Sequence, residues 1–122
     1  MSLLHEEITG QIIGAAFEVY RTLGYGFLEK VYQRAMQVEL IARGQKAELE
    51  RPIKVIYKRS IVGDYEADVF VQDSVIVEIK VAKEYQIADE AQLLNELRAT
   101  GTKVGMLINF GRTRVEFKRM VF

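Results

Sequence analysis

Cysteine is absent from this sequence of 122 residues, and histidine occurs only once. The absence of cysteine excludes disulfides, thiolate zinc sites and a cysteine nucleophile. The one histidine, His5, lies near the N-terminus, which disfavours a histidine-rich metal site or a Ser-His-Asp triad in the middle of the fold. Any acid–base or metal chemistry must therefore come from Asp, Glu, Lys or Tyr.

Long hydrophobic runs and a targeting signal are missing as well. No apolar run approaches the roughly 20 residues that a membrane span needs, and the acidic start MSLLHEEITG does not resemble a signal peptide. We therefore expect a reducing, cytoplasmic setting and no membrane partner. The formal net charge is zero, which counts against a strong nonspecific nucleic-acid binder but leaves room for a local basic patch.

The length and the hydrophobic share of 49% favour one α/β domain spanning residues 1–122. Apolar residues recur at helical spacing over 3–22 and 27–43, with Ser2 as a candidate cap for the first helix and Gly44 closing the second. From Lys46 the period changes to two. We predict strands at 46–58, 61–71 and 75–81, a helix at 88–100, and strands at 104–108 and 113–121.

The apolar stripes and edge positions follow from the same periodicity. The uninterrupted apolar segment 104–108 is typical of a strand buried on both faces. Pro52 indicates an edge strand or a bulge, and the charged segment 113–121 indicates an edge strand. The stripe of the second helix comprises Leu28, Val31, Tyr32, Ala35, Met36 and Leu40. In the helix at 88–100, Ala91, Leu94, Leu97 and Arg98 are in phase.

The segments 65–71 and 75–81 are strongly apolar strands that nevertheless contain charges. Residues two apart in a strand share a face, so Glu78 and Lys80 project together. If Val71 pairs with Val75 across a three-residue loop, Asp68 lies opposite Glu78. A two-residue loop would place the two acids on opposite faces, because a slip of one residue reverses the side.

Two carboxylates facing each other in central strands repel, and a divalent cation would relieve that repulsion. Oxygen ligands suit Mg²⁺ or Mn²⁺. Such an ion polarises a phosphoryl oxygen and activates water, and Lys80 could orient that water or neutralise charge on phosphate. The alternative is that Asp68, Glu78 and Lys80 form ordinary ion pairs on a solvated sheet face.

Two further polar positions admit a structural and a functional interpretation. Glu29 is most simply explained as the third helical residue of a capping box that begins at Gly26, but it could also point towards the metal. Gln92 would face solvent by default, or contact substrate phosphate or the region of Lys80.

The sequence blocks together resemble the GxxExxY family, which is assigned to the PD-(D/E)XK nuclease superfamily. The resemblance covers about residues 6–120 and implies a restriction-endonuclease-like α-βββ-α-β core with an extra N-terminal helix and a C-terminal edge strand. The proline of the superfamily motif is replaced by Ala67. The blocks are Gly26-x-x-Glu29-x-x-Tyr32, Tyr65-x-Ala67-Asp68, Val77-Glu78-Ile79-Lys80, Glu90-Ala91-Gln92-Leu93-Leu94 and Gly105-x-Leu107-Ile108-Asn109-Phe110.

By resemblance, Asp68, Glu78 and Lys80 correspond to the motif residues, Glu29 is an additional metal-site acid and Gln92 a polar residue of the later helix. We therefore expect a metal-dependent nuclease that acts on DNA rather than RNA. A small domain that cleaves DNA often dimerises to reach both strands, so a homodimer is compatible with this hypothesis. The second hypothesis is a catalytically silent module that binds nucleic acid or protein on the same fold.

Overall fold

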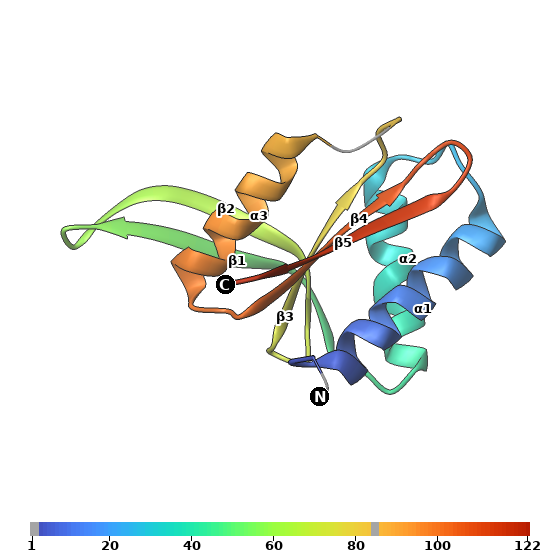
Figure 1. Cartoon of the computed structure of the whole chain (residues 1–122), viewed down its shortest axis with the longest axis horizontal. Coiled ribbons are helices and arrows are strands. Elements are labelled where there is room, and N and C mark those ends of the chain that lie inside the picture. The colour runs from blue at the N-terminus through green and yellow to red at the C-terminus, as the bar shows by residue number, and fades with distance from the viewer. Residues whose placement is uncertain (1–2, 84–85) are drawn as a thin grey trace.

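The computed structural model describes residues 3–83 and 86–122, and it confirms the predicted order ααβββαββ (Figure 1). The predicted cap Ser2 lies outside the described residues. Within the described part of the chain, no helix is long and apolar enough to span a membrane. The elements are α1 (Glu6–Leu23), α2 (Glu29–Ala42), β1 (Ala47–Tyr57), β2 (Ser60–Val71), β3 (Val75–Lys80), α3 (Ile87–Thr100), β4 (Val104–Phe110) and β5 (Val115–Val121).

The five strands form one sheet in the order β1-β2-β3-β4-β5. Strands β3 and β4 are parallel because α3 carries the chain back across the sheet, and the other neighbours are antiparallel. Both edge predictions are confirmed, since β1 with Pro52 and β5 lie at the two edges. Strand β4 is buried along its whole length, as its apolar sequence predicted.

Strands β1 and β2 form a long hairpin that extends away from the rest of the molecule (Figure 1). Its two-residue turn consists of Lys58 and Arg59, both with positive φ (47° and 71°). Strand β2 pairs with β3 only between Val69–Val77 and Val71–Val75. The two strands therefore separate directly after this short ladder, next to Asp68 and Glu78.

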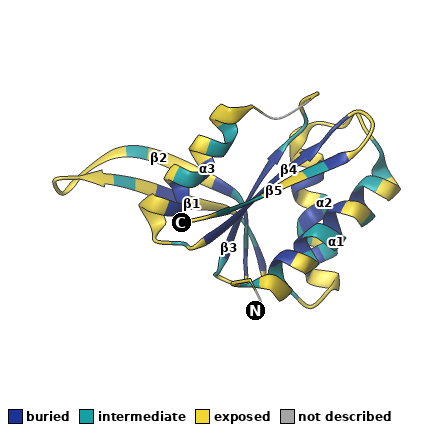
Figure 2. Cartoon of the chain, viewed as in Figure 1, coloured by how far each residue is buried: buried dark blue, intermediate teal, exposed yellow. Residues whose placement is uncertain are grey.

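Two hydrophobic clusters cover the two faces of the sheet (Figure 2). The larger one lies beneath α1 and α2, and the smaller one beneath α3. In α2 the stripe is correct for Tyr32, Met36 and Leu40, but Leu28 and Val31 are exposed. Leu28 precedes the helix as its N-cap, and Val31 lies in the first helical turn.

The predicted phase of α3 is right for Leu97, which is buried, and Leu94 is half-buried. It is wrong for Ala91 and Arg98, which are exposed, and the other buried residues are Leu93 and Glu96. Leu93 is placed by close packing on β4, because a Cβ added to Gly105 would lie 2.9 Å from Cδ1 of Leu93. The glycine lets α3 approach the sheet closely, and this approach selects the face that carries Glu96.

The capping box predicted for α2 is also wrong. The N-cap is Leu28, no side chain caps the helix, and Glu29 is the first helical residue rather than the third. The Tyr32 hydroxyl donates a hydrogen bond to the Gly24 carbonyl at 2.5 Å, and Gly26 has φ 114°. This contact keeps the glycine turn in a non-helical conformation, so the helix begins later.

Candidate functional site

The Asp68 and Glu78 carboxylates lie on one face of the sheet. Val71 pairs with Val75 across a three-residue loop, which confirms the register on which the site was predicted. Asp68 Oδ2 accepts a hydrogen bond from the Ile79 N–H at 2.7 Å, and Glu78 Oε1 lies 3.4 Å from the Asp68 nitrogen. Each carboxylate thus contacts the other strand's backbone at the point where the ladder ends.

Strand alternation places Lys80 on the same side as Glu78. Val77 and Ile79 pack into the larger core on the opposite face, as predicted. Glu78 is 5% exposed. The Lys80 ammonium lies 3.8 Å from Asp89 Oδ1 of α3, which is beyond hydrogen-bonding distance.

Helix α2 brings Glu29 to the site from the other direction. Gln33 donates a hydrogen bond from Nε2 to the Asp68 carbonyl at 2.8 Å, and Glu29 lies one turn earlier on the same helix face. Partial burial raises the pKa of Glu29, and the charge of Asp68 raises it further, while Lys80 opposes the shift. Glu29 is therefore close enough to Asp68 for their charges to interact.

The carboxyl groups of the site are held in an environment that disfavours their ionised forms. Burial raises the pKa of Asp68, although the hydrogen bond from Ile79 and the charge of Lys80 partly offset this effect. Burial, followed by repulsion from Asp68 and Glu96, raises the pKa of Glu78 to about 10. In the absence of a cation, Glu78 is therefore protonated at neutral pH.

Glu96 is a site residue that the sequence interpretation missed. It lies on α3, is 3% exposed, and approaches Glu78 closely enough for the two carboxyl groups to share a hydrogen bond when one is protonated. Burial is the main cause that raises the pKa of Glu96. The signal in the sequence was a glutamate at helical spacing with Leu93 and Leu97, which the wrong helix phase concealed.

Gln92 is exposed, as its default interpretation predicted. Its Nε2 donates a hydrogen bond to Glu96 Oε2 at 3.2 Å. Its contacts with the region of Lys80 and with substrate phosphate stay predictions.

The donor set fits a hard divalent cation. Carboxylate oxygens from several elements crowd together with raised pKa values, and Glu96 Oε1 is buried without a hydrogen-bond partner in the described part of the chain. Among residues 3–83 and 86–122, no group of three or more Asp, Glu, His or Cys side chains is arranged to hold an ion. A Mg²⁺ site does not require three protein ligands, because the ion usually retains several waters and binds only one or two carboxylates.

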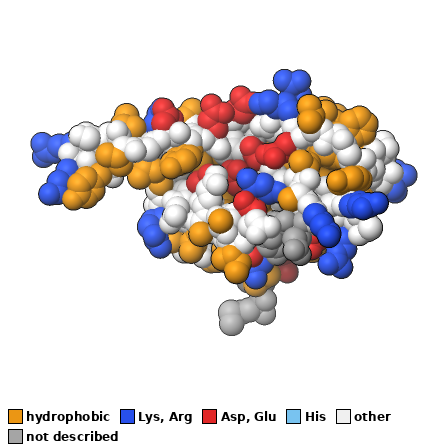
Figure 3. Space-filling model, turned by 90° about the horizontal axis from the view of Figure 1, so that it is seen from above, with side chains coloured by type: hydrophobic (Ala, Val, Ile, Leu, Met, Phe, Trp, Pro, Cys, Tyr) orange, Lys and Arg blue, Asp and Glu red, His pale blue; other side chains and the backbone are white. Residues whose placement is uncertain are grey.

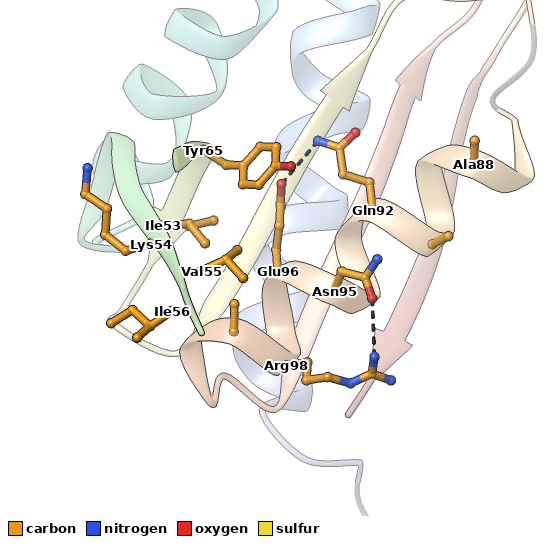
Figure 4. Close-up of a pocket in the computed structure, with 12 residues that line it drawn as sticks. Ile53, Lys54, Val55, Ile56, Tyr65, Ala88, Gln92, Asn95, Glu96 and Arg98 are labelled. Atoms are coloured by element: carbon orange, nitrogen blue, oxygen red, sulfur yellow. Dashed lines mark hydrogen bonds between the residues drawn. The ribbon is translucent and has the colours of Figure 1, made fainter. Parts of the chain in front are cut away.

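A groove of about 850 Å³ runs between the β1–β2 hairpin and α3 (Figure 4). Gln92 and Glu96 lie in its wall, opposite Ile53 and Tyr65, whereas Asp68 and Glu78 do not line it. The groove thus reaches the acidic site from the side of α3. Viewed from above, acidic side chains gather near the middle of the molecule with lysine and arginine side chains around them (Figure 3).

The fold has a counterpart among solved structures. The crystal structure of SSO0001 superposes with a TM-score of 0.58 at 16% sequence identity, and the match covers 76% of this chain. The chain spans 50% of the length of that protein. At this identity the similarity concerns the fold alone, which is a mixed α/β architecture of the restriction-endonuclease type.

Comparison with functionally curated proteins found no match. The family model of the PD-(D/E)XK nuclease superfamily, in contrast, matches residues 6–120. Members of this superfamily are in general metal-dependent nucleases that act on nucleic acid. The chain belongs to the PD-(D/E)XK nuclease superfamily.

Proposed function

We propose that the protein is a metal-dependent nuclease of the GxxExxY family that hydrolyses phosphodiester bonds in DNA rather than RNA. The observation that carries the proposal is the meeting of Asp68 and Glu78 at the end of a short ladder, with Lys80 on the same face. Buried acids that repel each other destabilise a fold, so their presence at one point of this sheet favours a role with a cation.

In this proposal Asp68 and Glu78 hold Mg²⁺ or Mn²⁺, and Glu29 supports the ion directly or through a water. When bound, the ion supplies Lewis-acid polarisation of the phosphoryl oxygen and a water of lowered pKa. The Lys80 ammonium orients the water or neutralises charge on the phosphate. The Ile79 N–H fixes the Asp68 carboxylate, and Gln33 fixes the backbone that carries it.

A cleavage assay with matched variants tests the proposal. The purified chain is incubated with plasmid DNA, single-stranded DNA or RNA in Mg²⁺, Mn²⁺ or EDTA. We expect metal-dependent cleavage that falls by about 10²-fold or more in Asp68→Asn and in Lys80→Ala. The control is Asp64→Asn, because Asp64 lies on the same strand but pairs with Lys54 on the exposed hairpin.

If Asp68→Asn cleaves as well as the parent, these residues are not the active site. Cleavage of RNA in preference to DNA would reject DNA as the substrate, while the proposed roles of Asp68, Glu78 and Lys80 would stand. Size measurement with and without DNA tests the predicted homodimer, and the predicted cytoplasmic setting requires localisation in cells.

A catalytically silent module on the same fold is the second candidate. The zero net charge favours it, because strong nucleic-acid binders usually carry a basic excess. Calorimetric titration with Mg²⁺ or Mn²⁺ near neutral pH separates the two candidates. Absence of binding would favour the module, and binding that Asp68→Asn removes would favour the enzyme.

A further inference from the structure

The carboxylate of Glu96 is buried but only half satisfied. One oxygen, Oε2, accepts a hydrogen bond from Gln92 at 3.2 Å. The other oxygen, Oε1, is inaccessible to solvent, and no N–H or hydroxyl group of the described residues donates to it. Besides Gln92, the neighbouring group that can donate a hydrogen bond to Glu96 is the Glu78 carboxyl group while it carries a proton. A buried acceptor without a partner destabilises the folded state, and a charged acceptor does so more strongly. When both Glu78 and Glu96 are ionised, these two buried carboxylates have no proton between them, and a cation would take its place.

The surroundings of Glu96 identify the charge of that group. The nearby ionisable side chains that act on it are the acids Glu78 and Asp68, and the cation Lys80. The Lys80 ammonium is itself placed beside Asp89 of α3. One lysine therefore lies among four carboxyl groups, and a divalent cation would offset most of the excess negative charge.

The position of Glu96 also suits an ion that is approached from the groove. The side chain extends from α3 with the Gln92 amide at its carboxylate (Figure 4). Asp68 and Glu78 reach the same region from the sheet but do not line the groove. Glu96 thus lies between the groove and the two acids that the proposed function assigns to the ion.

We propose that Glu96 is an additional acid of the divalent-cation site, which binds the ion or one of its waters through Oε1. This inference rests on the proposed function, because it assumes that Asp68 and Glu78 hold the ion. A water-mediated contact agrees with the lack of a preformed three-acid group among the described residues. Gln92 then serves as a positioning residue that holds the opposite carboxylate oxygen.

Mn²⁺ affinity provides a test that does not depend on cleavage. The full chain at pH 7.5 is titrated with Mn²⁺, and the free ion is followed by electron paramagnetic resonance. We expect Glu96→Gln to weaken binding by about tenfold to a hundredfold. Asp64→Asn, which removes the same charge from an exposed position on the β1–β2 hairpin, should change the affinity by less than about twofold because exposed charges are screened.

Glu96→Asp distinguishes a contact from a general charge effect. It keeps the charge but shortens the side chain by one methylene group, so we expect it to weaken binding too. Thermal unfolding in EDTA shows whether each variant folds. If Glu96→Gln does not fold, the Mn²⁺ affinity of Glu96→Asp is the measurement that tests the proposal.

Unchanged or tighter Mn²⁺ binding in Glu96→Gln would overturn the inference, and so would parental affinity in Glu96→Asp. If Asp68→Asn abolishes binding while Glu96→Gln does not, the proposed function stands and only the role of Glu96 is rejected. If the unmodified chain binds no Mn²⁺, both proposals fail.

Discussion

Replacing Glu78 by Gln should stabilise the metal-free protein at neutral pH. Burial and the neighbouring acids Asp68 and Glu96 raise the pKa of Glu78 from 4.5 to about 10 in the folded chain. In the unfolded chain the carboxyl group ionises near its ordinary value. Folding must therefore keep a proton on Glu78, and this requirement becomes less favourable as pH rises.

The magnitude follows from the linkage between pKa and stability. The contribution of Glu78 is fully favourable below pH 4.5 and is lost progressively up to pH 10. Each pH unit in this window is worth about 1.4 kcal/mol. At pH 7, which is 2.5 pH units above 4.5, the penalty is thus at most about 3.5 kcal/mol. Glu78→Gln removes this penalty because a neutral amide of similar shape takes the place of the acid.

Urea unfolding in EDTA at pH 5, 7 and 8.5 measures this effect. The difference between Glu78→Gln and the parent should be small at pH 5 and grow with pH, while the exposed Glu66→Gln should show no such trend. Addition of Mn²⁺ should reverse the order, because an ion bound only by the folded parent stabilises it. An equal difference at pH 5 and pH 8.5 would refute the argument that Glu78 is buried as a protonated acid.

Three further predictions concern the scaffold of the site. Leu97→Ala should lower the free energy of unfolding, measured with urea, by about 2–5 kcal/mol, since the Leu97 side chain of α3 is fully buried against the sheet. Replacing Lys58-Arg59 by Asn-Gly should raise it by about 1 kcal/mol, because both residues have positive φ in a two-residue hairpin turn; a lower unfolding midpoint would contradict this. Tyr32→Phe removes the hydrogen bond to Gly24 and should reduce stability by about 1 kcal/mol, with increased amide exchange in the glycine turn as its local signature.

Much of the architecture could be predicted from local sequence patterns. The change of period near Lys46 located the sheet, and alternation reduced the position of Asp68 to two alternatives. The structure has the three-residue loop, in which Val71 pairs with Val75. These features depend on neighbouring residues only: backbone pleating makes side chains alternate, and a short loop leaves few registers. The uninterrupted apolar run of β4 revealed its position in the middle of the sheet in the same way.

The errors occur where distant segments pack against each other. The phase of α3 was assigned from the spacing of Ala91, Leu94, Leu97 and Arg98. Close packing on Gly105 of β4 selects instead the face that carries Leu93 and Glu96. Likewise, the start of α2 depends on the contact between Tyr32 and Gly24. No periodicity within either helix contains this information.

The sequence by itself therefore determined the order of the elements and the common face of Glu78 and Lys80. Only the tertiary structure decided that Asp68 shares this face, that Glu96 lies against Glu78 and that Glu29 lies near enough to Asp68 for their charges to interact. The physical reason is that alternation and loop length act over a few residues. The meeting of a helix and a strand depends instead on the close packing of side chains that are distant in the chain.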